Sequence, residues 1–64
     1  MADLDALREK CDVLAEELAD AALDLLRAAV DGDEAAAGVE KRVTRARRSV
    51  EKAATLLAPP AGRD

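Results

Sequence analysis

The residues of this chain whose types and spacing suit a binding role are basic and lie in its second half. Four of them follow one another at intervals of four, three and four residues: Lys41, Arg45, Arg48 and Lys52. On a helix this spacing places the side chains along one face, which we call the basic stripe. A basic stripe can follow the phosphates of a nucleic acid or bind an acidic partner.

The distribution of charge suggests a second interpretation of the basic stripe. Residues 1–31 carry nine acids and three bases, whereas residues 32–58 carry four acids and six bases. Opposite charges on two packed helices attract each other across their interface. The basic stripe would then pair with acids of the first half, which are Glu9, Asp12, Glu16, Glu17 and Asp20.

Other reactive groups are few. The chain contains one cysteine, no histidine and no aromatic residue, so neither a soft-metal site nor a base-stacking platform is expected. Glu16, Glu17 and Asp20 bring carboxylates together, and we interpret them as a solvated acidic face. Cys11 lies among leucines, where a thiol packs as a small apolar side chain. We therefore predict no catalytic residue, no cofactor and no metal, and we predict that the protein is not an enzyme.

Two ladders of apolar residues predict the helices that position these residues. Intervals alternate between three and four in the first half, at Leu4, Leu7, Cys11, Leu14, Leu18, Ala21, Leu25 and Ala28. The second half repeats the pattern at Ala36, Val39, Val43, Ala46, Val50, Ala53 and Leu57. This spacing is typical of a helix that packs along another helix. We predict an all-α antiparallel helical hairpin, with helices over about residues 3–30 and 33–58.

A short break separates the two ladders. Gly32 suits the left-handed position that follows a helix, and Asp33 is a favourable N-cap for the next one. Gly38 leaves open whether segment 31–38 is loop or the start of the second helix. Pro59 and Pro60 cannot continue a helix, so residues 1–58 form the hairpin and residues 59–64 a flexible tail.

The size of the chain favours self-association. A domain of 64 residues without a disulfide buries little apolar surface, so small domains of this kind often need a partner. We predict a homodimer that forms a four-helix bundle, in which the second helix covers the first ladder within each chain. Its core would consist of Leu4, Leu7, Leu14, Leu18, Leu25, Val39, Val43, Val50 and Leu57.

Three further apolar residues lie off the first ladder. Leu23, Leu26 and Val30 have their own spacing of three and four, and Leu23 lies about 160° around a helix from Leu25. We predict that these three residues form a self-association or partner face, which we call the loop-end patch. Alanines at 15, 22 and 29 also widen the first ladder on one side.

Two segments resemble parts of known families. The break Asp31-Gly32-Asp33-Glu34 is similar to the loop of the Rop family of RNA-binding hairpins, which implies a dimeric four-helix bundle. The RNA-contacting face of that family corresponds here to apolar side chains, so the RNA function does not carry over. The run from Leu7 to Leu18 resembles the first helix of the all-helical chorismate mutases. That resemblance implies a carboxylate-binding role for Arg8. The family also needs a second arginine, and Leu25 occupies the aligned position in this chain.

These observations favour a non-catalytic hairpin that acts through protein–protein interaction. It would self-associate, or serve as an adaptor or regulatory subunit of a larger partner. The alternative is a nucleic-acid-binding regulator that uses the basic stripe. The acidic start of the chain lacks a signal-peptide pattern and no apolar run is long enough to span a membrane, so we expect a cytoplasmic protein. The richness in alanine, arginine and aspartate suggests a bacterial source.

Overall fold

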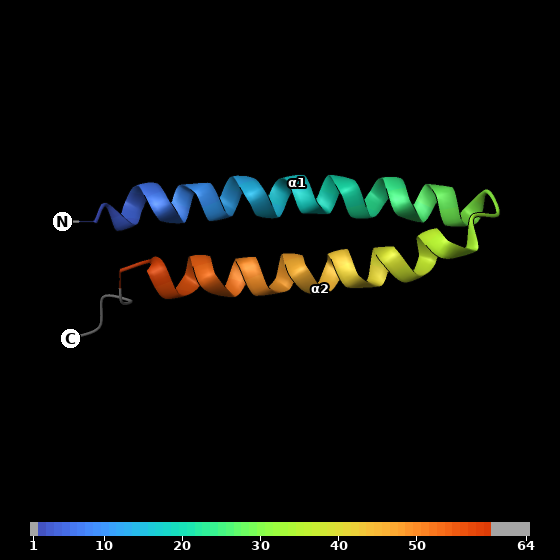
Figure 1. Ribbon diagram of the computed structural model, residues 1–64. Coiled ribbons are helices and arrows are strands. Elements are labelled where there is room, and N and C mark those ends of the chain that lie inside the picture. The colour runs from blue at the N-terminus through green and yellow to red at the C-terminus, as the bar shows by residue number, and fades with distance from the viewer. Residues whose placement is uncertain (1, 60–64) are drawn as a thin grey trace.

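The chain folds as an antiparallel pair of helices joined by a short connection (Figure 1). The computed structural model describes residues 2–59. Helix α1 spans Leu4–Val30 and helix α2 spans Glu34–Leu57. The predicted all-helical hairpin is confirmed, with each helix boundary within one residue of its expected position. The predicted tail lies outside the described residues except for Pro59.

Both helices begin at an aspartate that caps them. The Asp3 carboxylate accepts a hydrogen bond of 3.1 Å from the backbone N–H of Ala6, and the Asp33 carboxylate accepts one of 3.2 Å from Ala36. Each bond satisfies a backbone donor that has no partner within the first turn of its helix. The two capping residues therefore define where the helices start.

The connection between the helices is a glycine-dependent turn. Gly32 has a φ of +109°, in the region that side chains with a Cβ rarely adopt. Its N–H donates to the carbonyl of Ala29, and the N–H of Asp33 donates to the carbonyl of Ala28. This pair of bonds closes the end of α1 as a Schellman motif. The connection is thus residues 31–33, and Gly38 lies inside α2.

The centre of the hairpin is made of alanines. Four residues of the described part of the chain are buried, with between 4% and 9% of their surface exposed: Ala15, Ala22, Ala36 and Ala54. Small side chains at these positions let the two backbones approach each other closely. They also bury little apolar area, because alanine contributes a single methyl group.

The expectation that α2 covers the whole first ladder within one chain is contradicted at three of its leucines, whereas the other ladder residues are half-buried. Leu4, Leu7 and Leu14 are 51%, 41% and 45% exposed, and Val39 is 43% exposed. The physical reason is rotation: α1 turns Ala15 and Ala22 toward α2, which places Leu14 about 100° away from the contact. The remaining predicted core residues are half-buried: Leu18, Leu25, Val43, Val50 and Leu57.

The hairpin forms a single layer of helices. Its Cα atoms extend over 51 × 24 × 12 Å, so the smallest dimension corresponds to one helix. Domains commonly bury their core between two packed layers, and one layer leaves a broad face uncovered. Neither of the helices described is both long and apolar enough to cross a membrane.

Candidate protein interaction surfaces

One broad face of the hairpin is polar. Asp12 and Glu16 of α1 line the same shallow depression as Arg47 and Glu51 of α2. The Nε atom of Arg47 is 3.9 Å from a carboxylate oxygen of Glu51 and has no hydrogen-bond partner. The long stem of Arg47 lies beside Ala15 in this depression, so the polar face covers one side of the alanine contact.

The opposite broad face is apolar. Leu14 and Glu16 lie about 100° to either side of the buried Ala15, so Leu14 is directed away from the polar face. On α2, Ala53 and Thr55 flank the buried Ala54 in the same way, and Thr55 lies on the polar side. The ladders of both helices therefore share one surface.

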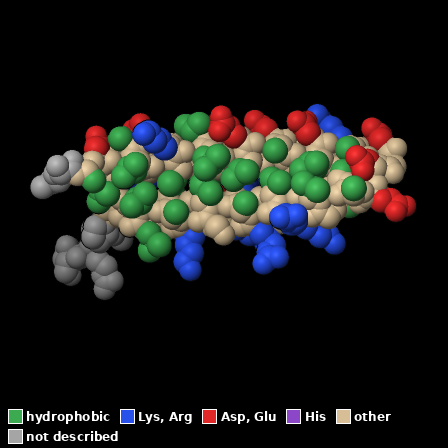
Figure 2. Space-filling model, in the orientation of Figure 1, with side chains coloured by type: hydrophobic (Ala, Val, Ile, Leu, Met, Phe, Trp, Pro, Cys, Tyr) green, Lys and Arg blue, Asp and Glu red, His purple; other side chains and the backbone are tan. Residues whose placement is uncertain are grey.

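We call this surface the apolar face. Figure 2 shows its hydrophobic side chains gathered along both helices. Its α1 residues are those of the first ladder, which are Leu4, Leu7, Cys11, Leu14, Leu18, Ala21, Leu25 and Ala28. Its α2 residues are Val39, Val43, Ala46, Val50, Ala53 and Leu57. The face thus joins the two predicted ladders side by side instead of against each other.

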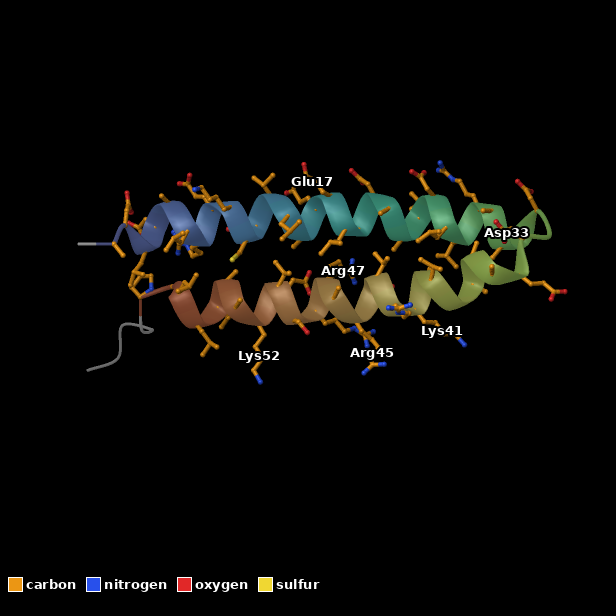
Figure 3. All side chains as sticks on the ribbon, in the orientation of Figure 1. Glu17, Asp33, Lys41, Arg45, Arg47 and Lys52 are labelled. Carbon is orange, nitrogen blue, oxygen red and sulfur yellow. The ribbon has the colours of Figure 1, made fainter. Side chains whose placement is uncertain are left out.

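The two long edges of the hairpin carry opposite charge. Glu17 points away from α2, whereas Arg45 and Lys52 point away from α1 (Figure 3). Glu17 lies beside Leu14 on the surface, and Arg45 lies beside Ala46. We call Glu17 and Asp24 the acidic edge, and Arg42, Arg45 and Lys52 the basic edge. In Figure 2 red side chains predominate along the α1 edge, with blue ones among them, and blue side chains stand along the α2 edge. Lys10 lies beside Glu17 and Leu14 on the α1 edge.

The basic stripe is exposed to solvent. Its four residues are exposed, and Lys41, Arg45 and Lys52 project away from α1 (Figure 3). The ion pairs of the described chain join residues of the same helix, namely Arg8 with Asp5, Arg27 with Asp24, and Arg47 with Glu51. Pairing of the stripe with the acids of α1 is therefore wrong within this chain.

The loop-end patch is a separate surface of α1. Leu23 and Leu26 are each 47% exposed and Val30 is 83% exposed. Leu26 and Val30 line a shallow depression together with Arg27 and Asp31, next to the connection between the helices. The patch is small compared with the apolar face, which continues over both helices.

The remaining candidate residues do not form a reactive cluster. Cys11 is a free, half-buried thiol within the apolar face. Among residues 2–59, no group of three or more His, Cys, Asp or Glu side chains is arranged to hold a metal ion. Arg8 is 3.9 Å from Asp5 in the first two turns of α1 and lies near Asp12 and Glu51. An arginine surrounded by carboxylates is poorly placed to bind a further anion.

The apolar face is the candidate interaction surface that sequence reasoning did not locate. Its residues were identified as a ladder, but the ladder was assigned to the contact inside the hairpin. The signal for the actual contact was present in the alanines at 15, 22 and 29, which repeat every seven residues. Comparisons with protein families, with curated proteins and with solved structures found no match to this chain.

Proposed function

We propose that this chain is a non-catalytic helical hairpin that acts through protein–protein interaction. It self-associates through the apolar face, and the resulting dimer is a four-helix bundle. The observation that supports this proposal is the exposure of Leu4, Leu7, Leu14 and Val39 on one surface that continues over both helices. Extended apolar patches of this kind mark interaction sites in soluble proteins.

The energetic argument follows from the alanine centre of the hairpin. Full burial of a leucine or valine stabilises a structure by about 1.5–3 kcal/mol, whereas the four buried residues among positions 2–59 are alanines. Covering each half-exposed leucine would contribute roughly 1 kcal/mol, and the symmetry of a dimer doubles the number of residues covered. A second hairpin supplies the missing second layer and completes the core that the ladders predict.

The proposal is tested by the mass of the protein in solution. We expect sedimentation equilibrium to give a dimer for the unmodified chain. The double variant Leu7→Glu with Leu14→Glu should be monomeric, because two carboxylates would be buried in the dimer interface. A matched control, Leu23→Glu with Leu26→Glu, changes two equally exposed leucines off the apolar face and should remain dimeric.

The mass of the unmodified chain tests self-association even if a variant unfolds. A helical monomer over the whole accessible concentration range would contradict the proposal, and circular dichroism would establish that the monomer is folded. If the variant with Leu7→Glu and Leu14→Glu remained dimeric, the interface would lie outside the apolar face, and the loop-end patch would be the first candidate.

We propose the loop-end patch as the contact for a larger partner, which would make the dimer an adaptor or regulatory subunit. The patch lies off the apolar face, so it stays exposed when the dimer forms. Affinity capture with the unmodified chain and with the Leu23→Glu, Leu26→Glu variant tests this role. Capture that is equal for both chains would sink the assignment of this patch.

A nucleic-acid-binding regulator is the second candidate, because the basic stripe is exposed and makes no ion pair with α1. Binding to duplex DNA or RNA should then weaken steeply as salt increases. Arg45→Glu with Arg48→Glu should abolish binding, whereas Arg27→Glu, an exposed cation of α1, should not. Absence of binding to either nucleic acid at low salt would exclude this candidate.

A further inference from the structure

We infer that the second copy docks on the apolar face in one orientation. The connecting loops of the two hairpins lie at the same end of the bundle, and α1 of each copy packs on α2 of the other. This inference rests on the proposed self-association and adds the relative orientation of the two copies. It follows from the opposite charges of the two edges that border the apolar face.

Symmetry leaves two ways of placing one apolar face on another. A dimer of identical chains has a two-fold axis, which lies in the plane between the two faces. An axis parallel to the helices puts α1 over α2 of the second copy and keeps both loops at one end. An axis across the helices puts α1 over α1 and α2 over α2, with the loops at opposite ends.

The level of each residue along the rod follows from the polar face. Asp12 and Glu16 share one depression with Glu51 and Arg47, so Asp12 lies level with about Glu51 and Glu16 with about Arg47. Because the helices are antiparallel, a higher-numbered residue of α1 lies level with a lower-numbered residue of α2. Glu17 therefore lies level with about Ala46, one residue from Arg45. Asp24 lies level with about Val39, less than one helical turn from Arg42.

The same-end orientation brings the acidic edge of each copy over the basic edge of the other. Glu17 faces Arg45 of the second copy, and Asp24 faces Arg42. Both attractive pairs occur twice in the dimer. Lys10 lies level with Lys52 of the second copy, which is the one like-charged pair along this seam.

The opposite-end orientation brings like charges together along both seams. Arg45 and Glu17 lie near mid-length, so each would face its own copy across the axis. Arg42 would lie level with about Val50 of the second copy, two residues from Lys52, so the basic edge of one copy would run along the basic edge of the other. The attraction between Lys10 and Asp24 of the second copy offsets only part of this repulsion.

Side-chain size weakly favours the opposite-end orientation. Leu7 and Leu14 lie far from the loop and Ala21 and Ala28 lie near it, so the same-end bundle is thicker at one end. Helix axes pack between 8 and 10 Å apart, and a taper of about 2 Å along a helix of about 40 Å needs only a slight tilt. The taper is therefore accommodated, whereas the facing charges of the opposite-end bundle are not removed by a tilt.

Spin labels on the loop distinguish the two orientations. Asp31→Cys in a Cys11→Ala background places one label beside each loop, and Asp20→Cys provides a control near mid-length. Two loop labels at the same end should lie within about 30 Å, whereas opposite ends separate them by at least the length of α1, about 40 Å. The control labels should give a short distance in both orientations.

A charge swap provides the second measurement. In the same-end dimer, Glu17→Arg or Arg45→Glu alone should raise the dissociation constant about three- to tenfold at low salt, and the double variant should restore it. In the opposite-end dimer each residue faces its own copy, so all three variants should bind like the unmodified chain.

The outcomes separate this inference from the proposal on which it rests. A folded monomer in sedimentation contradicts self-association itself. A dimer with loop labels about 40 Å apart or more, or with no response to the charge swap, overturns the orientation and leaves self-association intact. A dimer with close loop labels and a rescued double variant supports both.

Discussion

Two glycines of this hairpin should respond in opposite directions to the same substitution. Gly38 lies in the first turns of α2, has no positive φ and has no atom within 4 Å of a Cβ built on it. Gly32 also has open space around it, but its φ is +109°. Gly38→Ala should therefore stabilise the protein, and Gly32→Ala should destabilise it.

The magnitudes follow from backbone conformation alone, because a methyl group meets no neighbour at either site. Alanine is favoured over glycine in a helix interior by about 0.8–1 kcal/mol, which sets the expected gain at residue 38. A residue with a Cβ in the left-handed region costs about 1–2 kcal/mol, which sets the expected loss at residue 32. In a domain of this size 1 kcal/mol shifts the melting temperature by roughly 4–8 °C.

The assay is thermal and urea unfolding followed by circular dichroism. All chains must be compared at one protein concentration, because self-association raises the melting temperature with concentration. The two variants should move to opposite sides of the unmodified chain. A Gly38→Ala protein that melts below it would mean that α2 does not run through residue 38. A Gly32→Ala protein without loss would refute the left-handed turn.

Three further predictions concern the cap, the alanine contact and the assembly. Asp33→Ala should lower the free energy of unfolding by about 1 kcal/mol in urea titrations, whereas Asp33→Asn should retain most of it because the amide oxygen still accepts. Ala22→Leu should cost about 1–3 kcal/mol by forcing the helices apart, and the exposed Ala37→Leu should stay within about 0.5 kcal/mol; equal effects would contradict the assigned contact. The melting temperature should rise as protein concentration increases from about 1 to 100 μM, and a constant value would argue against a dimer.

The positions of the helices could be predicted from the sequence because their signals are local. Asp3 and Asp33 cap the first turns of their helices, and Gly32 takes the left-handed turn between them. Each of these depends on backbone geometry within a few residues, so neighbouring sequence is enough to identify it. The ambiguity at Gly38 arose because glycine lowers helix propensity without preventing a helix.

Which face of each helix contacts the other helix could not be predicted in the same way. Alternating spacing of three and four residues identifies an apolar stripe, but a stripe that includes both Leu14 and Ala15 is wide enough to contact a partner through either side. Both choices bury apolar residues, so the sequence pattern alone does not rank them.

Sequence by itself therefore determined the two helices, the cap of the second helix, the turn and the uneven charge, since these depend on residues close together in the chain. Only the tertiary structure decided that Ala15, Ala22, Ala36 and Ala54 make the contact and that Leu4, Leu7 and Leu14 remain on an open face. That decision depends on how two whole helices approach each other. Alanines permit the closest approach of the backbones, and the larger side chains are then left beside the contact, bordered by an acidic edge and a basic edge.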